Sequence, residues 1–171
     1  MLRLTTCAVA VALLGTASLS AATREEEAKR YAADLKSKDA KVRTTALKEL
    51  GRLGSLQRKL TEPYVTDIMS VLKDSDSKVR GEAARTLGLI DPPETKAAIT
   101  KLAEMLKDEK AQDAREGMEM GLGELGGTTD DADLKKTARE ALMEARKKAD
   151  DKREQKVIQA AVLLITGPKK K

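Results

Sequence analysis

Large aromatic side chains and histidine are nearly absent from this sequence of 171 residues. It contains no phenylalanine, tryptophan or histidine, and its only aromatic residues are Tyr31 and Tyr64. Because aromatic rings usually fill much of a globular core, we expect instead a core of Ala, Leu, Val, Ile and Met side chains on closely packed helices. Such a core leaves no deep central pocket, and the missing rings remove the usual platforms for stacking nucleic-acid bases.

Cysteine is also scarce, and its one occurrence lies in a segment with the features of a secretory signal. Arg3 supplies the positive start, residues 4–19 are mostly apolar, and Ser20 to Ala22 are small, so we predict cleavage after Ala22. The apolar stretch of 16 residues is shorter than the ~20 that a spanning helix needs; an uncleaved membrane anchor is the alternative. Cleavage would remove Cys7, leaving no cysteine for a disulfide or a reactive thiolate.

A clustered excess of positive charge is missing as well. The formal net charge is +5, it falls to +4 without Arg3, and three of the remaining positive charges belong to the tail, residues 168–171, which we expect to be disordered. The rest of the chain is almost balanced, so nothing suggests nucleic acid as a partner. With 40% hydrophobic and 36% charged residues, the chain suits a folded protein built from strongly amphipathic elements.

One apolar spacing recurs in residues 39–54, 76–91 and 111–126. Apolar residues follow one another after four, four and three positions, which places them on one face of a helix. This apolar ladder consists of Val42, Ala46, Leu50 and Leu53; Val79, Ala83, Leu87 and Ile90; and Ala114, Met118, Leu122 and Leu125. An arginine follows the first ladder position (Arg43, Arg80, Arg115), and a glycine follows the third (Gly51, Gly88, Gly123).

A second amphipathic helix is predicted before each of these segments, from apolar residues at i, i+3, i+4 and i+7. These residues are Ala28, Tyr31, Ala32 and Leu35; Val65, Ile68, Met69 and Leu72; and Ile99, Leu102, Ala103 and Leu106. A weaker fourth pair follows, with Ala138, Ala141, Leu142 and Ala145 on its first helix and Val157, Ala161 and Leu164 on its second, where Arg153 takes the first ladder position. Successive repeats are offset by 37, then 34 or 35, then 39 residues. The domain, residues 23–167, therefore divides into units of about 24–54, 61–91, 93–127 and 130–166.

Residues at the expected helix ends support this division. Asp39 and Asp76 are suited to cap helix N-termini, and Pro63 and Pro93 suit first turns. Gly54 and the pair Gly126–Gly127 suit left-handed positions at helix C-termini. No segment alternates with period two, so we predict no strands.

A single helix pair cannot bury both of its apolar stripes, whereas stacked pairs bury them in one continuous core. The predicted fold is all-α: an α-solenoid of about four antiparallel helix pairs, preceded by the signal-peptide helix.

The motif Asp39, Val42, Arg43, Leu50 and Gly51 returns as Asp76, Val79, Arg80, Leu87 and Gly88. This pattern resembles bacterial HEAT-like repeats, the type also named after phycobilisome lyases, over about residues 24–166. The third unit departs with Ala111 in place of the Asp, and the fourth lacks both the Val-Arg pair and the Leu-Gly step. The resemblance implies an α-solenoid whose second helices line a concave face, and a function in binding far more often than in catalysis.

Three local motifs carry chemistry in other proteins, but each has a structural explanation here. Residues 121–126 spell G-x-G-x-x-G, which binds dinucleotides only after a strand; here it falls at the end of a predicted helix. Met118 and Met120 could ligate copper, but they point to different sides of a helix. The acidic runs 25–27 and 130–131 suit helix N-termini. We therefore predict no catalytic, cofactor-binding or metal-binding residue.

The recurring arginines Arg43, Arg80 and Arg115 should form a row along the stacked units. The row could bind anions or a peptide. We favour ion pairs between neighbouring units, with Asp39 and Asp76 as partners, because such pairs satisfy charges that are otherwise buried.

The best candidate for a partner-binding surface is the side of the second helices opposite the apolar ladder. It carries Thr44, Lys48 and Arg52; Gly81, Arg85 and Leu89; and Glu116, Met120 and Glu124. We select Lys48, Arg52, Arg85, Glu116 and Met120 as candidate binding residues. The strip changes from basic to acidic along the array, a polarity that would orient a partner. A merely solvated face is an equally good interpretation.

The sequence thus predicts an exported, non-enzymatic scaffold or adaptor, periplasmic or extracellular, whose partner is another protein. One alternative is an enzyme on the same fold, such as a bilin lyase or a DNA glycosylase; the lack of histidine, mature cysteine and aromatic rings argues against it. Another is an envelope structural protein anchored to a membrane by an uncleaved N-terminus. A secondary hypothesis is self-association through the C-terminal end, because the segment from Val157 to Ile165 is the most apolar of the predicted helices.

Overall fold

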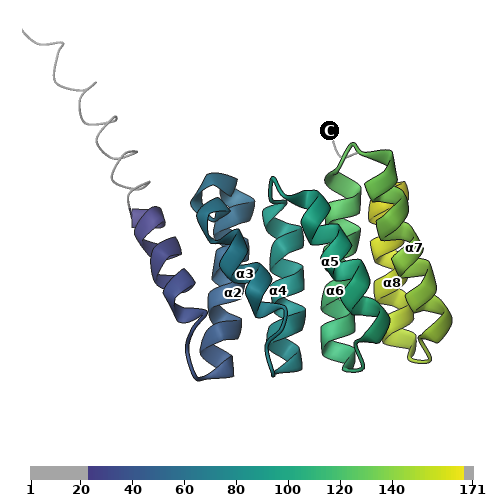
Figure 1. Cartoon of the computed structure of the whole chain (residues 1–171), viewed down its shortest axis with the longest axis horizontal. Helices are drawn as coiled ribbons and strands as arrows, with labels where there is room; N and C mark the ends of the chain where they lie inside the picture. Colours follow the sequence, from purple (N-terminus) through teal and green to yellow (C-terminus); the bar gives the residue numbers. More distant parts are fainter. Residues whose placement is uncertain (1–22, 168–171) are drawn as a thin grey trace, which may run out of the picture.

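The computed structural model describes residues 23–167, and all the regular structure in that range is helical (Figure 1). A first helix over residues 23–34 is followed by α2 (Ala40–Leu56), the short 3-10 turns η1 (Arg58–Leu60) and η2 (Glu62–Tyr64), α3 (Val65–Val71), α4 (Ser77–Ile90), α5 (Thr95–Asp108), α6 (Gln112–Thr128), α7 (Ala132–Lys148) and α8 (Lys152–Thr166). The predicted signal segment, with Cys7, and the basic tail, residues 168–171, lie outside the described residues.

The helices form a single row of antiparallel pairs (Figure 1). We call the first member of each pair the A helix (residues 23–34, α3, α5 and α7) and the second the B helix (α2, α4, α6 and α8). The B helices pack on one another in chain order, α2 on α4, α4 on α6 and α6 on α8, while α5 packs on α7. The fold is the predicted α-solenoid of four helix pairs within the described range.

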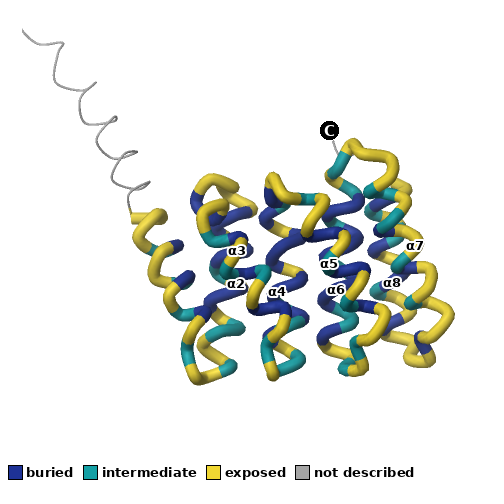
Figure 2. Tube along the Cα trace, viewed as in Figure 1, coloured by how far each residue is buried: buried dark blue, intermediate teal, exposed yellow. Residues whose placement is uncertain are grey.

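The apolar ladder forms the core of the array. All of its members on α4 and α6 are buried, as are Ala46, Leu50 and Leu53 on α2, and Figure 2 shows buried residues recurring along the packed helices. The expectation for Val42 is wrong, because its side chain is 37% exposed. No B helix precedes α2 in the described range, so Val42 borders only a shallow hollow that it shares with Tyr31 and Asp34 of the first helix (Figure 1).

The fourth unit has a different register from the one predicted. On α8 the buried residues are Glu154, Ile158, Ala161 and Ile165, whereas Arg153, Val157 and Leu164 were expected with Ala161. The reason is an offset of 40 rather than 39 residues. Gln155 donates to the carbonyl of Ala149 just as Arg43 donates to the carbonyl of Ser37, each six residues earlier, so Gln155 corresponds to Arg115, 40 residues before it.

Helix capping is largely as expected, but the role of the glycines is not. Asp39 and Asp76 accept backbone N–H groups at the starts of α2 and α4. Pro63 lies in the first turn of η2, whereas Pro93 precedes Glu94, the N-cap of α5, and so lies outside that helix.

No glycine in the described range has a positive φ, which corrects the expectation for Gly54, Gly126 and Gly127. All three lie within helices, where a side chain would meet a neighbouring helix. A Cβ at Gly54 would lie 2.6 Å from Cγ1 of Ile90, and one at Gly126 would lie 2.9 Å from Cδ1 of Ile165. These glycines therefore set the close spacing of helices rather than their ends.

Candidate functional site

Each recurring arginine holds its unit to the next through a two-pronged ion pair. The Nε and Nη2 of Arg43 both lie 2.7 Å from the carboxylate oxygens of Asp74. Arg80 binds Glu109 in the same way at 2.8 and 2.9 Å, and Arg115 binds Glu154 at 2.6 and 2.9 Å. Such planar, charge-assisted pairs are among the stronger polar contacts in proteins and fix geometry as well as charge. We call them the ion-pair ladder.

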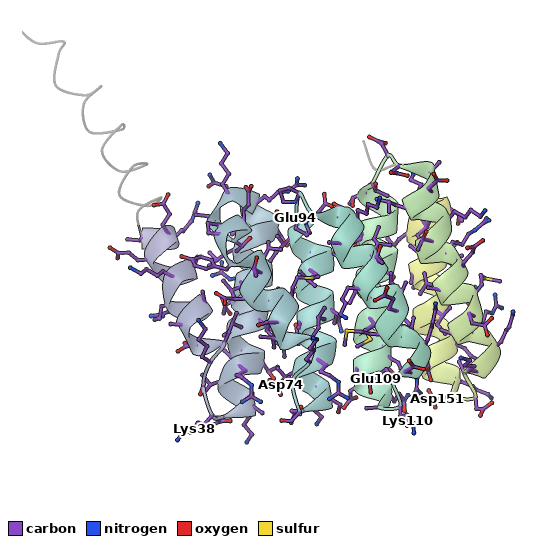
Figure 3. All side chains as sticks on the ribbon, in the orientation of Figure 1. Lys38, Asp74, Glu94, Glu109, Lys110 and Asp151 are labelled. Atoms are coloured by element: carbon purple, nitrogen blue, oxygen red, sulfur yellow. The ribbon has the colours of Figure 1, made fainter. Side chains whose placement is uncertain are left out.

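The acidic partners differ from those predicted. Asp39 and Asp76 cap their own helices, while the acids that face the arginines come from the next unit along the chain. Asp74 and Glu109 lie in the turns before α4 and α6, at the lower end of the array in Figure 3. Each also accepts a backbone N–H two residues later, so one carboxylate orders a turn and binds an arginine.

These contacts keep the turn acids ionised. Burial raises the pKa of Asp74, but the hydrogen bonds from Arg43 and from the backbone of Asp76 outweigh it, so the pKa lies below the ordinary value. The pKa of Glu109 is lowered chiefly by its hydrogen bond from Arg80. The turns therefore carry fixed negative charge.

Sequence reasoning missed Glu119, a carboxyl group buried between α6 and α8. Its side chain is fully buried, and neither carboxylate oxygen has a hydrogen-bond partner among residues 23–167. Burial, with a smaller contribution from nearby Glu154, raises its pKa to about 8, against the opposing effect of Arg115. The sequence held one signal: by the repeat offset, Glu119 takes the position of Leu47 and Ala84, both fully buried apolar residues.

The B helices share a hollow of about 220 Å³ on the side opposite the apolar ladder. We call it the B-face hollow; it is lined by Thr44 and Lys48 of α2, Lys78, Gly81, Glu82 and Arg85 of α4, Asp113, Glu116 and Gly117 of α6, and Arg153 of α8. A Cβ at Gly117 would overlap the backbone of Gly81, so α4 and α6 touch through their main chains here. The hollow is therefore formed by the stacking of several B helices and not by any one of them.

Of the five candidate binding residues, three line the B-face hollow. Lys48 and Arg85 are exposed, and neither makes an ion pair within the described chain. The carboxylate of Glu116 is 11% exposed and binds Arg153 at 2.8 Å. Arg52 and Met120 do not line the hollow. Arg52 pairs with Glu49 at 2.8 Å, and Met120 is half-buried.

The hollow also contains charged residues that were not predicted. Lys78 and Asp113 lie near the starts of their helices, and Glu82 one turn after Lys78. The predicted change from basic to acidic along α2, α4 and α6 was read from one strip of positions only. Arg153 of α8 adds a positive charge beyond the acidic residues of α6, so the sign of the charge changes again along the hollow.

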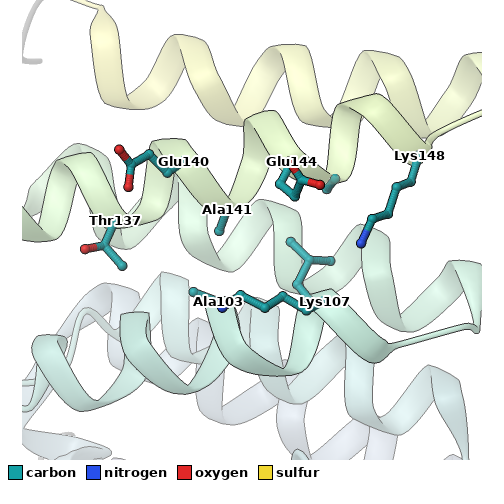
Figure 4. A pocket seen from close by; sticks show the side chains of 9 residues that line it. Ala103, Lys107, Thr137, Glu140, Ala141, Glu144 and Lys148 are labelled. Carbon is teal, nitrogen blue, oxygen red and sulfur yellow. The ribbon is translucent and has the colours of Figure 1, made fainter.

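A second hollow, of about 340 Å³, lies on the opposite side between α5 and α7 (Figure 4). Ala103, Leu106, Ala141 and Ala145 line it together with Lys107, Thr137, Glu140, Glu144 and Lys148. We call it the A-face hollow. Alanines on both facing helices form its small apolar floor. The carboxylate of Glu144 lies 2.9 Å from Nζ of Lys147, and this hydrogen bond lowers the pKa of Glu144. A carboxylate kept ionised in this way is not poised for acid–base chemistry at neutral pH.

Other chemistry finds little support in the described part of the chain. No group of three or more His, Cys, Asp or Glu residues is placed to hold a metal ion there. Met118 is fully buried while Met120 is half-buried on another side of α6, and residues 121–126 pack inside the array. Among residues 23–167, no helix combines the length and the apolar character needed to cross a bilayer.

Comparison with known proteins agrees with the architecture. The sequence profile of the family described as HEAT repeats matches residues 32–123 and 66–163. The fold is similar to the crystal structure of an engineered protein from the Northeast Structural Genomics Consortium, with a TM-score of 0.62 and 22% identity. That match covers 86% of this chain and 64% of the engineered protein, so this chain spans less than two thirds of its length. Comparison with curated proteins gives no match. Because the family profile accounts for most of the sequence and the fold is an α-solenoid, the chain belongs to the HEAT-repeat family.

Proposed function

We propose that this protein is an exported, non-enzymatic scaffold or adaptor that binds another protein through the B-face hollow. HEAT repeats generally mediate protein–protein interaction. The observation that carries the proposal is the pair of exposed cations, Lys48 and Arg85, which line a hollow formed by all four B helices and lack ion-pair partners in the described chain. A surface that draws on four repeats suits an extended partner better than a small molecule.

The packing around the hollow favours binding by a rigid surface. The ion-pair ladder joins each unit to the next, and α4 meets α6 through glycine backbone. Side chains held on such a framework lose less freedom when a partner docks, which favours affinity. The A-face hollow is lined at its floor by alanines and carries an acid already paired with Lys147, so we assign the binding function to the B face.

Export rests on the sequence of residues 1–22 and on the absence of cysteine from residues 23–171. A chain without cysteine suffers no unwanted disulfides in an oxidising compartment. Sequencing the N-terminus of the mature protein tests this part. We expect Thr23 as the first residue; an intact Met1 in a membrane fraction would favour the anchored alternative.

Site-specific photo-crosslinking tests the binding face, and the chain offers a matched pair of positions. Thr44 lines the B-face hollow and Thr137 the A-face hollow, and each hydroxyl donates to the carbonyl four residues earlier. With a photoreactive residue at each position in turn, we expect a protein adduct from Thr44 and none from Thr137. An adduct from Thr137 alone would reject the B face.

Self-association through the C-terminal end stays a secondary proposal. The outer side of α8 exposes Gln155, Gln159 and Leu163, and Leu163 is 60% exposed. Leu163 and the small side chain of Ala160 are the exposed apolar residues of α8 in the described range, and they offer little area for a stable dimer. Sedimentation that gives a monomer at high concentration would remove this proposal.

A further inference from the structure

Arg85 differs from every other arginine on the B helices. Arg43, Arg52, Arg80, Arg115 and Arg153 each have a carboxylate oxygen within 4 Å. Arg85 has none in the described chain, and its side chain is exposed. A guanidinium is weakly hydrated and presents a planar fork that fits a carboxylate. Of the six arginines on the B helices, Arg85 is thus the one whose guanidinium is open to an acid from another molecule.

Two lysines extend the positive charge around Arg85. Lys48 comes from α2, and Lys78 lies two turns before Arg85 on α4. Neither is in an ion pair with a described residue. The three cations therefore line the hollow from α2 and α4.

The acids of the hollow do not cancel this charge. Glu116 is bound to Arg153 at 2.8 Å and is already neutralised. Glu82 and Asp113 remain, and neither approaches a cation of the hollow closely enough for an ion pair. With Glu116 paired to Arg153, three cations and two acids remain on the lining, so the hollow keeps a net positive charge.

The floor of the hollow is low where α4 and α6 cross. Gly81 and Gly117 have no side chains, and Thr44 turns its hydroxyl back to the carbonyl of Ala40. A segment lying over these residues would meet backbone rather than bulky side chains, while its own side chains reach the cations on the walls.

We propose that the B-face hollow binds an acidic segment of the partner protein, with a carboxylate seated between Arg85 and Lys48. This inference rests on the proposed function and gives it a partner class. Lys78 holds a second acidic residue of the segment.

Two synthetic peptides of opposite charge test the proposal directly. Each has about twelve residues, a length typical of extended recognition segments, with glutamate alternating with serine in one and lysine with serine in the other. Fluorescence anisotropy with the purified protein measures their affinities at low and physiological ionic strength. We expect the glutamate peptide to bind and the lysine peptide to bind at least about tenfold more weakly. Equal binding of both peptides, preference for lysine, or no binding of the glutamate peptide would overturn the proposal.

A matched pair of charge reversals separates a site from general attraction to a basic protein. Arg85→Glu changes the hollow, whereas Arg139→Glu makes the same change at another exposed arginine, on α7. We expect Arg85→Glu to weaken the glutamate peptide by about tenfold or more, and Arg139→Glu to change it less than about twofold. Equal losses would show non-specific attraction and reject the site. Thermal unfolding checks that both variants are folded.

Further variants show how Arg85 contacts the segment. They also separate a failure of the acidic-segment inference from a failure of the proposed B-face function. If Arg85 holds a carboxylate with two nitrogens, Arg85→Lys retains part of the affinity that Arg85→Gln loses. If a photoreactive residue at Thr44 captures a partner whose yield is unchanged by Arg85→Glu, the B-face function stands and the acidic-segment inference fails. If Thr44 captures nothing while Thr137 does, the proposed function itself fails.

Discussion

Arg115 binds Glu154 through two nitrogens at 2.6 and 2.9 Å, and in this last ion pair of the ladder the acid comes from a new position. In the second and third units the acid is in the turn, at Asp74 and Glu109, and the first ladder position of the B helix is apolar. By the 40-residue offset, the fourth unit has Ala149 at the turn position and Glu154 at the ladder position. In the fourth unit the acid and the apolar residue have exchanged positions, and the ion pair with the arginine is kept.

This exchange predicts a compensated double substitution. Glu154→Val alone should destabilise the protein by about 2–4 kcal/mol, because it leaves the guanidinium of Arg115 partly buried without its carboxylate. Adding Ala149→Glu restores the arrangement of Arg80 and Glu109 and should recover more than half of the loss. Urea unfolding of the single and double variants measures both changes. A double variant no more stable than Glu154→Val would show that the turn position cannot replace Glu154.

Glu119 predicts an unusual dependence of stability on pH. Its pKa in the folded protein is about 8, raised from an ordinary value of 4.5. Between these values the folded state binds one proton more than the unfolded state, so stability falls as pH rises from about 4.5 to 8 and this contribution is constant above 8. The slope from a single group is at most about 1.4 kcal/mol per pH unit.

Glu119→Gln should remove that slope, since glutamine keeps the shape and does not ionise. The variant should therefore be more stable than the native protein at pH 8, with a smaller difference near pH 5, as measured by urea unfolding across this range. Glu140→Gln, on an exposed position of α7, is the control and should leave the pH profile unchanged. Parallel profiles of native and Glu119→Gln proteins would mean that Glu119 titrates normally.

Two buried glycines should respond to alanine with losses of stability of very different size. At Gly117 a Cβ would collide with the carbonyl oxygen and Cα of Gly81, which are backbone atoms and cannot move aside. At Gly51 the nearest atom, 3.1 Å away, is the end of the flexible side chain of Leu89. Alanine is favoured over glycine in a helix by about 1 kcal/mol.

Gly51→Ala should therefore stay within about 1 kcal/mol of the native stability, while Gly117→Ala should lose about 3 kcal/mol or more through overpacking. Thermal and urea unfolding compare them directly. Similar losses at both sites would imply that α2 and α4 are as rigidly packed as α4 and α6.

The parts of the fold that could be predicted are those that repeat. Leu50, Leu87 and Leu122 share one ladder position, and all three are fully buried, because each B helix inside the array meets the same neighbours. The capping residues Asp39 and Asp76 were predictable for the same reason, since a short polar side chain at a helix start acts locally. The exposure of Val42 could not be predicted, because it depends on which helix lies next to α2 and not on the residue type.

The partners of the arginines could not be read from the spacing. The acid five residues before the first ladder position changes from Asp74 to Glu109, and in the last unit it moves to the ladder position itself, at Glu154. No single motif therefore marks it. The recurrence of glycine did indicate contact between helices, but we interpreted several glycines as helix ends. Gly51, Gly88 and Gly123 follow the same ladder position inside the helices, which indicates helix contact rather than termination. Gly54, Gly126 and Gly127 follow the same logic.

The apolar ladder itself gives the last prediction. Leu87 is fully buried between α4 and its neighbours, whereas Leu89, two residues later on the same helix, is 46% exposed on the B face. Leu87→Ala should cost about 2–5 kcal/mol, because a cavity opens in a core that the rest of the array holds in place. Leu89→Ala removes the same atoms where water already reaches them and should cost less than about 1 kcal/mol. Urea unfolding of the two variants compares identical chemical changes in two environments. Because the units unfold together through shared interfaces, the Leu87 loss should appear as a shift of the whole transition. Comparable losses at both positions would contradict a core that lies between the B helices.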